Sequence, residues 1–466
     1  MSKGEIYDGE DLNSPLGRLY LCPETEQIMN CSMFLEHPID VQAFKTAFSN
    51  SVMIKDPRFC SLLVRNPSGG DHWKRVDVNI DEHFILHYPS TKTETGSLDN
   101  EAAVNAYLSD IAVSTPLRKD KPLWEVHVLV ELKCVVLRVH HSVGDGVSLM
   151  SMLSSCFGNK IISDIDVMKK HKKKIHENKK WKIKGLWGLI KSIWFTIVFG
   201  LRFLGRVLGV KNNVSVVSGG DGVELWPRKL MTAKFMIQDF KSIKVAIPSV
   251  TVNDVLLGVI SHGLSKYVGA KSHKALQQSP QVTAILVVNL RGVSCLQEKT
   301  CTDSTIANSS NGLSIWRNKT GLMLLPLYCC NGLHPLDHVK TMKKTMDKKK
   351  NSYEAQISHV FLKLMTTYFG PKAASWCCHK VLCNTDLLIS NIMGPSEEIA
   401  IANNPVVSIR VNISGQPQAI TLHMVSYAGK ADMQVMVAKD IISDPEFLVN
   451  CFQDSLVEMK TPPKKF

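Results

Sequence analysis

Apolar positions in the first third of the chain recur with the periods that distinguish strands from helices. Residues 28–34 include an apolar patch, whereas residues 124–130 alternate in character, residues 134–139 are apolar, and both of these predict strands. Only three residues separate the last two, which predicts a hairpin. A helical period over 41–51 predicts a helix, and the apolar residues of 147–157 predict a buried helix that directly follows the turn after the hairpin.

A capping box marks the start of a helix in the second half of the chain. Thr251 is followed three residues later by Asp254, an arrangement in which each side chain satisfies the other residue's backbone N–H group. The apolar positions that follow have a helical period, and Gly269 is a stop signal. The sequence therefore predicts a long helix that begins near Asn253.

The rest of the second half also alternates between strands and helices. Strands are predicted at 281–290, 386–392, 420–427 and 432–437, and helices at 335–350, at 353–365 and after Asp444-Pro445. This alternation predicts an α/β or α+β fold with mixed sheets.

Length and charge divide the chain into three parts. A chain of 466 residues, 44% hydrophobic and 21% charged, is long enough for two or three globular domains. The net charge is +13, and the run from Lys169 to Lys184 holds nine lysines and one acid, which gives +8 and leaves +5 for the other 450 residues. We therefore expect an N-terminal domain at 1–165, a linker at 166–226 and a C-terminal domain at 227–466.

The linker contains an apolar helix with a basic stripe. Residues 186–210 are long enough to span a bilayer, but charges interrupt the segment. At about 100° per residue, four bases fall on one side of the helix: Lys184, Lys191, Arg202 and Arg206. A helix lying in the membrane interface fits this pattern better than a spanning helix.

Other interpretations of the linker remain open. The lysine run is also typical of a solvated linker, and a spanning helix is compatible with lysine and arginine side chains that extend to the interface. Spanning would, however, place the two halves of the protein on opposite sides of the membrane. Nucleic-acid binding is the least favoured interpretation.

The termini and the cysteines indicate a reducing compartment. Residues 1–13 are polar and acidic and carry no secretory signal, so we expect the chain to begin in the cytosol. The 13 cysteines are scattered and include no C-x-x-C pair, which suggests reduced thiols and neither a disulfide framework nor a zinc site. We expect no metal and no cofactor.

The candidate chemistry lies in a turn between the predicted hairpin and the buried helix. His140 and His141 are followed by Asp145 and Gly146. An imidazole titrates near neutrality and can take a proton from an alcohol. The amino end of the following helix would favour the neutral imidazole, and glycines at 144 and 146 would permit backbone conformations that other residues avoid. A surface bend between strand and helix is the alternative.

This loop resembles H-H-x-x-x-D-G, the signature of the wax ester synthase/diacylglycerol acyltransferase family within the CoA-dependent acyltransferase superfamily. Further stretches resemble the family in the expected order, and the likeness is to its plant branch. These stretches are Ser14-Pro15 with Arg18, Pro122-Leu123-Trp124, Asn253-Asp254, Val288-Asn289-Leu290-Arg291 and Ser390-Asn391-Ile392-Met393-Gly394-Pro395.

The resemblance implies two chloramphenicol-acetyltransferase-like domains, joined by a crossover, with a tunnel between them. It implies that His141 is the general base, that His140 supports the loop or the substrate, and that Asp145 shapes the loop through an ion pair with Arg291. It also implies that Asn253 and Asn391 line the tunnel. For Arg291, a surface charge after a strand is the alternative, and each asparagine has an alternative role as a helix-start or turn residue.

Two stretches depart from the family pattern. Asp11-Leu12-Asn13-Ser14-Pro15 stands where P-L-S-P is more common, and Trp316-Arg317-Asn318 stands where W-G-N is common. Neither touches His141, although acceptor preference is put in doubt. No D-F-G-W-G motif occurs, which argues against the soluble plant acyltransferases that share H-x-x-x-D-G.

The leading hypothesis is a membrane-associated wax ester synthase. It would use acyl-CoA as a substrate and a long-chain fatty alcohol as the acceptor, and diacylglycerol acylation is a second activity. Its expected location is the endoplasmic reticulum membrane, or else the plasma membrane, with the catalytic domains in the cytosol. The alternatives are a soluble acyltransferase acting on small alcohols or amines, and a catalytically degenerate member that only binds lipid.

Overall fold

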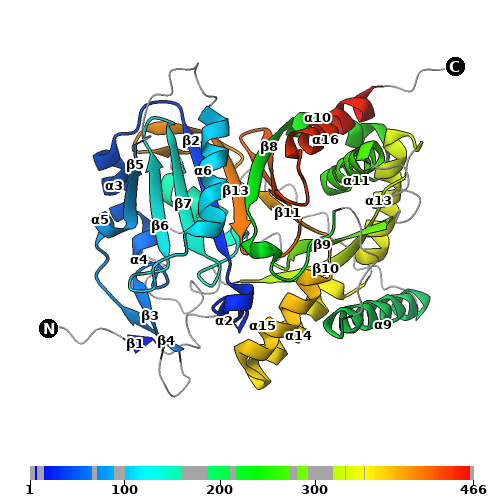
Figure 1. The fold of residues 1–466 in the computed structure, drawn as a ribbon, viewed down its shortest axis with the longest axis horizontal. Coiled ribbons are helices and arrows are strands. Elements are labelled where there is room, and N and C mark those ends of the chain that lie inside the picture. The colour runs from blue at the N-terminus through cyan, green and yellow to red at the C-terminus, as the bar shows by residue number, and fades with distance from the viewer. Residues whose placement is uncertain are drawn as a thin grey trace, which may run out of the picture.

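The computed structural model describes residues 6–7, 15–65, 71–88, 100–158, 186–209, 217–271, 281–291, 318–330, 332–350 and 352–461. The described chain forms two halves that lie side by side, each built around one six-stranded sheet (Figure 1). The lysine run that was predicted to be a linker, including Lys184, lies outside the described residues.

The sheet of the first half has the order β12-β13-β2-β7-β6-β5. Its strands are β2 (Ile28–Leu35), β5 (Phe84–His87), β6 (Trp124–Leu129), β7 (Cys134–His140), β12 (Ala400–Ile401) and β13 (Asn404–Ser414). The predicted hairpin is confirmed, since Trp124 of β6 lies opposite Val139 of β7 in an antiparallel pair. Strand β7 ends at His140, so the hairpin carries the histidine loop at its end.

The sheet of the second half has the order β10-β9-β11-β14-β15-β8. Its strands are β8 (Arg228–Met236), β9 (Gln281–Asn289), β10 (Thr320–Tyr328), β11 (Leu387–Met393), β14 (Ile420–Tyr427) and β15 (Lys430–Ala438). Strands β9, β11 and β14 are parallel and the outer pairs are antiparallel, which confirms the prediction of mixed sheets. Ala428 and Gly429 have positive φ values in the tight turn between β14 and β15.

Strands β12 and β13 cross from the second half into the sheet of the first half. Strand β13 pairs antiparallel with β2 from Ser414 opposite Ile28 to Val406 opposite Leu35. The predicted domain limits at 165 and 227 therefore do not divide the sheets, because residues 400–414 belong to the first sheet. Arg410 of β13 is buried and binds Asp432 at 2.8 Å, so this crossing strand is also joined to the second sheet.

Helices of the first half cover both the sheet and the boundary. The short helical elements are α2 (Pro15–Leu19), η1 (Pro23–Thr25), α4 (Val52–Lys55) and α5 (Ile80–His83), and the longer ones are α3 (Val41–Ser49), α6 (Asn100–Ser114) and α7 (Gly146–Phe157). Phe44 and Phe48 of α3 and Leu153 of α7 pack into one core with the sheet. Helix α6 packs on β8 of the second sheet, where Ser109 Oγ accepts a hydrogen bond from Leu230 N–H.

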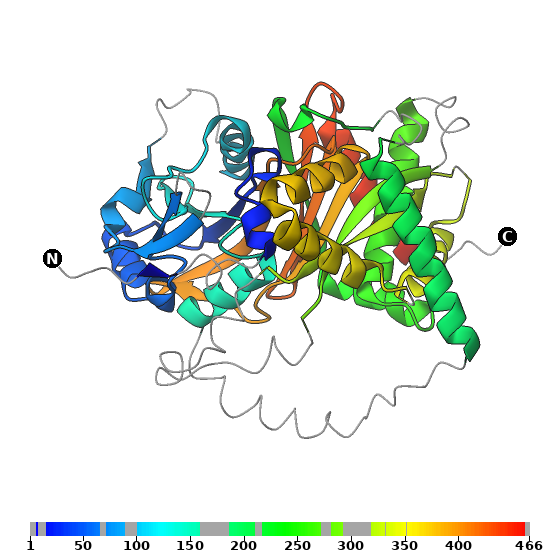
Figure 2. The same ribbon diagram turned by 90° about the horizontal axis from the view of Figure 1, so that it is seen from below.

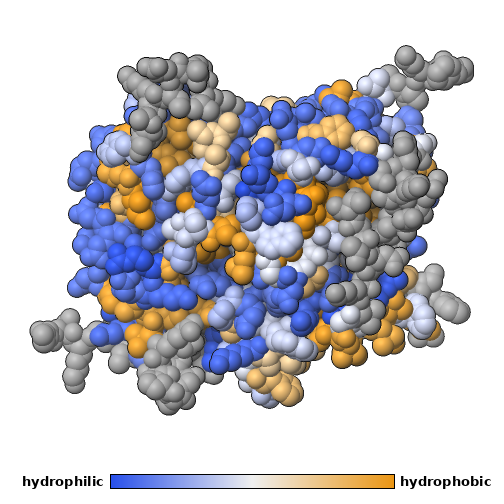
Figure 3. Space-filling model, in the orientation of Figure 1, coloured by the Kyte–Doolittle hydropathy of each residue, from blue (hydrophilic) through white to orange (hydrophobic). Residues whose placement is uncertain are grey.

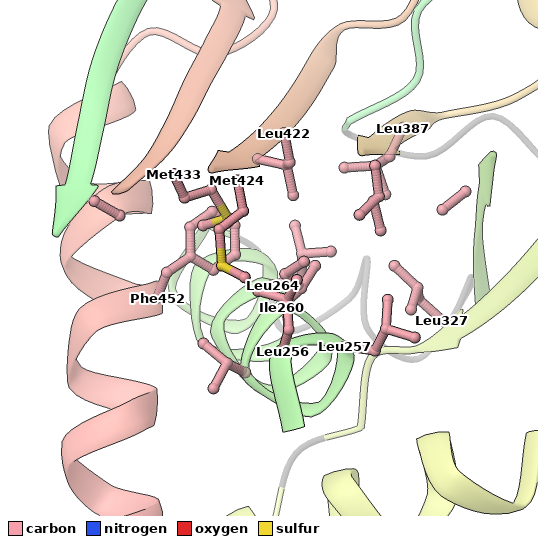
Figure 4. Close-up of a cluster of buried hydrophobic side chains, with 14 of the residues drawn as sticks. Leu256, Leu257, Ile260, Leu264, Leu327, Leu387, Leu422, Met424, Met433 and Phe452 are labelled. Carbon is pink, nitrogen blue, oxygen red and sulfur yellow. The ribbon is translucent and has the colours of Figure 1, made fainter. Parts of the chain in front are cut away.

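The core of the second half is built around the predicted long helix, α11 (Val252–Lys271). Its capping box is confirmed, because Thr251 N–H donates to Asp254 Oδ2 at 2.8 Å and Asp254 N–H donates to Thr251 Oγ1 at 3.2 Å. Its leucines pack between the sheet and Phe452 of the last helix (Figure 4). The neighbouring helices are α10 (Ile237–Ala246), α13 (Pro335–Lys350) and α16 (Pro445–Lys460).

Three further helices lie together on the other face of the second sheet. They are α9 (Leu186–Val207), α14 (Glu354–Tyr368) and α15 (Gly370–Cys383). Seen from below, α14 and α15 lie between α2 of the first half and α9 (Figure 2). None of the helices within the described ranges is long and apolar enough to cross a membrane.

The remaining elements are small. Strands β1 (Ile6–Tyr7), β4 (Asp71–Arg75) and β3 (Ser61–Arg65) form a three-stranded antiparallel sheet in that order. A 3-10 turn, η2 (Val223–Leu225), precedes β8.

Candidate active site

The loop after β7 lies at the boundary between the two halves. The backbone N–H of His141 donates to the carbonyl of Gln27 at 2.9 Å, which fixes the loop to the first half. Its own carbonyl accepts a hydrogen bond from Nδ2 of Asn318 at 2.8 Å, which fixes it to the second. Both halves therefore determine where the histidine lies.

The imidazole of His141 is buried and neutral at cellular pH. Its ring packs against the ring of Tyr20, with the centroids 4.2 Å apart, and Nδ1 makes no hydrogen bond of good geometry to any described residue. Burial lowers the pKa of His141 to about 4, although the carboxylate of Asp145 acts in the opposite direction. This direction favours the neutral imidazole, and its largest cause is burial, whereas the sequence pattern pointed to the amino end of the following helix.

Asp145 is the N-cap of α7 and the centre of a buried polar cluster. Its Oδ1 accepts hydrogen bonds from Ser148 N–H at 3.0 Å and from Ser148 Oγ at 2.9 Å. Its Oδ2 accepts hydrogen bonds from Arg291 at 2.8 Å and from Lys319 N–H at 3.0 Å. The predicted ion pair with Arg291 is confirmed, and its side chains are only 3% and 5% exposed. Four donors to one carboxylate fix the loop in place.

Gly146 is required for close packing across the boundary. A Cβ atom at this position would lie 2.5 Å from Cδ1 of Ile392, a residue of β11 in the second half. The expectation that glycine supplies an unusual backbone conformation here is wrong, because neither Gly144 nor Gly146 has a positive φ. The missing side chain lets α7 approach β11.

His140 belongs to a separate hydrogen-bonded group on the side of the first half. Its Nδ1 lies 2.7 Å from Ser142 Oγ and accepts a hydrogen bond from Ser142 N–H at 3.2 Å. Its Nε2 lies 3.6 Å from a carboxylate oxygen of Glu26, and this contact is the main cause that lowers the pKa of Glu26. A cavity of about 120 Å³ adjoins His140 and Glu26 and is also lined by Leu21, Leu63, Lys119 and Leu123. The longer tunnel stays a prediction.

Asn253 and Asn391 lie together although they come from different elements. Asn391 Nδ2 donates to Asn253 Oδ1, joining the start of α11 to β11. Ile392, the residue after Asn391, packs against Gly146 at the loop. The two asparagines are therefore brought together near the boundary, and their role in lining a tunnel stays a prediction.

His423 is a residue of this boundary that the sequence reasoning missed. On β14, Leu422 and Met424 face the core of the second half, whereas Val425 and Tyr427 pack with the core of the first half. Because side chains alternate along a strand, His423 points toward the first half. It is fully buried, and neither ring nitrogen has a hydrogen-bond partner in the described chain.

The titration of His423 links it to the candidate base. Burial and, in second place, the charge of His141 lower the pKa of His423 to about 3. Two neutral imidazoles thus face the same boundary. Tyr20 was missed as well, and burial raises the pKa of its phenol. Neither Tyr20 nor His423 lies in a recognisable motif, and only the fold brings these two residues to the loop.

The basic stripe of α9 does not face outward as predicted. Arg202 is exposed, but Arg206 is buried, and its guanidinium donates to the carbonyls of Asn384 and Arg202. The prediction that Arg206 contacts the membrane is therefore wrong. The side chain of Lys191 lies outside the described residues. The outward face of α9 is instead apolar, formed by Ile190, Ile193, Trp194, Ile197, Leu201 and Leu204, with Leu208 just beyond its end.

The geometry suits acid–base chemistry on a hydroxyl group. A neutral imidazole can accept a proton, and the buried ion pair of Asp145 and Arg291 holds the loop that carries it. Within the described chain, the group of side chains spaced to hold a metal ion lies elsewhere, at Asp221, His379 and Cys383. The loop therefore offers a base at the junction of two domains.

Comparisons with known proteins show the family of the chain. Residues 24–184 match the model of the wax ester synthase/diacylglycerol acyltransferase catalytic domain, and residues 316–460 match that of the WS/DGAT C-terminal domain. Wax ester synthase/diacylglycerol acyltransferase 11 of Arabidopsis thaliana is 30% identical over 480 residues, which cover 97% of this chain and 95% of the relative. Wax ester synthase/diacylglycerol acyltransferase 4 of the same plant is 29% identical over 99% of this chain and 92% of its own length.

Solved structures show the same fold. A wax ester synthase/diacylglycerol acyltransferase from Marinobacter aquaeolei VT8 superposes with a TM-score of 0.58 at 15% identity, covering 96% of this chain and 98% of the other. The trichothecene 15-O-acetyltransferase TRI3 of Fusarium sporotrichioides superposes with a TM-score of 0.55 at 12% identity, covering 96% of this chain and 93% of the other. The predicted two-domain acyltransferase architecture is confirmed.

Proposed function

Because the chain belongs to the wax ester synthase/diacylglycerol acyltransferase family, it is an acyl-CoA-dependent O-acyltransferase, and we propose that His141 is its general base. The acceptors are a long-chain alcohol, which gives a wax ester, and diacylglycerol, which gives triacylglycerol. The observation that carries the proposed role is the neutral, buried imidazole at the junction of the two halves.

His141 removes the proton of the acceptor hydroxyl group as the oxygen attacks the thioester carbonyl. The carbon–oxygen bond forms first, giving a tetrahedral oxyanion, and the carbon–sulfur bond then breaks. The thiolate of CoA leaves and takes the proton back from the imidazolium, so the base is restored without a covalent acyl-enzyme. Acyl-CoA is consumed as a substrate, and the reaction requires no metal or other cofactor.

Asp145 and Arg291 act on this reaction through the position of the loop. All the hydrogen bonds of Asp145 described above go to Ser148, Arg291 and Lys319, which leaves the carboxylate engaged in structure. We assign it a positioning role. His140, held by Ser142 and Glu26, orients the loop from the other side.

The experiment measures ester formation from acyl-CoA and a long-chain alcohol, together with release of free CoA thiol. Replacing His141 by alanine should lower turnover by at least about a hundredfold, as general-base catalysis implies. His37→Ala is the matched control, because His37 is an exposed histidine of the same half. Unchanged turnover in His141→Ala would refute the assignment, and a panel of alcohols and diacylglycerol then ranks the acceptors.

We further propose that α9 binds a membrane surface in the plane of the bilayer. The outward residues of α9 lie three or four apart and include Trp194 and Leu201, which are 62% and 65% exposed. Figure 3 shows hydrophobic residues at the lower right edge, where Figure 1 places α9. An apolar face of this size on a surface helix fits the interface of a bilayer.

The neighbouring helices also expose apolar side chains. Helix α9 packs against α15 and α14, which expose a further set of large apolar side chains: Ile357, Val360, Leu364, Tyr368, Phe369 and Trp376. In the sequence, the lysine run precedes α9 and would attract anionic lipids. We propose the endoplasmic reticulum membrane as the location, with the plasma membrane as the alternative, because the acceptors are themselves lipids.

A further inference from the structure

A cluster of metal-binding side chain types lies away from the candidate active site. His379 and Cys383 are four residues apart on α15 and so share one face of the helix. Asp221 lies in the turn before η2, and Glu224 lies within η2. Donor atoms of Asp221, His379 and Cys383 all lie within 4.8 Å of one another, and Glu224 Oε1 lies 3.7 Å from His379 Nε2.

The distances suit a tetrahedral ion. Zn²⁺ binds sulfur at about 2.3 Å and histidine nitrogen at about 2.0–2.1 Å, so these two ligand atoms lie about 3.5 Å apart at a tetrahedral angle. Cys383 Sγ lies 3.5 Å from His379 Nε2. The carboxylate oxygens of Asp221 and Glu224 lie 3.8 and 3.7 Å from the same nitrogen.

Burial adds a second observation. Oε2 of Glu224 is buried and has no hydrogen-bond partner among the residues that the structure describes, and His379 is only 8% exposed. A buried carboxylate oxygen without a partner is unfavourable, because it has lost its hydration. A divalent cation in contact with the carboxylate would compensate for this loss.

We propose that His379, Cys383, Asp221 and Glu224 form a binding site for a structural Zn²⁺ ion. The sequence pattern predicted no zinc site because its ligands are spread over two segments and include only one cysteine. Both ring nitrogens of His379 lie about equally far from Cys383 Sγ, at 3.6 and 3.5 Å. The sulfur therefore lies over the ring, so the proposed site requires the imidazole to turn until the lone pair of Nε2 points at the ion.

The position of the site indicates what a bound ion would do for the structure. Asp221 and Glu224 lie where the chain returns from α9 to β8, and α15 packs against α9. The other end of α15 reaches the first half, where Ser375 Oγ lies 3.0 Å from Thr25 Oγ1. An ion that joins the returning segment to α15 would therefore hold the membrane-facing helices in a fixed place relative to the catalytic loop.

Metal binding is tested on the full-length protein with cobalt and zinc. After chelator treatment, titration with Co²⁺ should give the visible bands of a tetrahedral ion and a thiolate charge-transfer band at one equivalent, and Zn²⁺ should displace it. Zn²⁺ should also raise the Tm, because it binds the folded state. Cys383→Ser and His379→Gln should each weaken binding by at least about tenfold.

The controls separate this site from the many other thiols and imidazoles of the chain. Cys330→Ser changes a partly exposed cysteine of another element and should retain the cobalt bands and the rise in Tm. Circular dichroism verifies that each variant is folded. Glu224→Gln removes a proposed ligand from η2 and leaves the sequence of α15 unchanged, so it tests the site from its other segment. The proposal is overturned if the parent protein binds no stoichiometric metal, or if the charge-transfer band survives in Cys383→Ser.

Discussion

The carboxylate of Asp145 and the guanidinium of Arg291 form a buried ion pair of 2.8 Å between residues 146 positions apart. Asp145 comes from the loop of the first half, and Arg291 comes from the segment just after β9 in the second half. The pair therefore makes the position of the His141 loop depend on the docking of the two halves.

Breaking this pair should affect both stability and activity. Arg291→Ala leaves the buried carboxylate of Asp145 without its main charge partner, which we expect to cost about 3–5 kcal/mol in the free energy of unfolding. Ester formation should fall at the same time, because the loop loses its fixed position. Urea unfolding and kcat measure the two effects. Lys340→Ala removes the exposed pair with Asp337 and should change stability by less than about 1 kcal/mol; equal losses in both variants would contradict the argument.

The rate of ester formation should be insensitive to pH across the neutral range. The base acts in its neutral form, and burial lowers the pKa of His141 to about 4. Activity should therefore fall only as the pH approaches about 4, and the acid limb should lie below that of an ordinary histidine. A profile of kcat/KM against pH measures this limb. An acid limb with an apparent pKa near 6.5 would show that burial does not lower the pKa of the base.

Acid should destabilise the protein partly through His423. Its pKa is lowered to about 3 in the folded state, whereas an unfolded histidine titrates near 6.5. The unfolded state therefore binds more protons between these values, so stability is present above pH 6.5 and is lost as the pH falls toward 3. In His423→Leu, the loss of unfolding free energy between pH 7 and pH 5 should be smaller than in the parent. An unchanged loss would mean that the folded-state pKa is not lowered.

A methyl group at position 146 should weaken the contact between α7 and β11. In Gly146→Ala the new carbon would lie 2.5 Å from Cδ1 of Ile392, so we expect a loss of about 1–3 kcal/mol in unfolding free energy. Ile392→Val removes that Cδ1 atom, and the double variant should recover part of the loss. A double-mutant cycle measures the coupling, and strictly additive effects would contradict the predicted clash.

Charges on the outer face of α9 should release the protein from membranes. Trp194→Glu with Leu201→Glu replaces two exposed apolar side chains, and binding to anionic vesicles should weaken about tenfold or more. Flotation with vesicles measures this. Val245→Glu is the matched control, because Val245 is 86% exposed on α10. If the double variant floats as well as the control, α9 is not the membrane contact.

Local patterns predicted most of the elements that carry the loop. The capping box at Thr251, the β6–β7 hairpin and helix 335–350 follow from short-range periodicity and are confirmed. Strand β13 was missed, and its buried Arg410 shows why: a charged residue in a strand is read as exposed unless its partner, here Asp432, is known. Such pairings between distant segments are not visible in periodicity.

The candidate site was predicted only in part, because contacts between distant segments are not visible in the sequence. His141, Asp145 and Arg291 were found because they resemble a family motif. Tyr20 and His423 were not, since Tyr20 directly follows α2, His423 lies within β14, and nothing in the neighbouring sequence marks either residue. Arg206 was placed on the wrong face because a helical projection locates the bases but not the protein surface against which the helix packs.

The crossing of β13 also constrains the order in which the first sheet can form during synthesis. Strand β2 leaves the ribosome early, but its partner on one side, residues 404–414, is synthesised much later. Until then β2 presents an unpaired edge, and such edges promote association between chains. A fragment that ends in the linker would keep this edge open, and we expect such a fragment to associate through it.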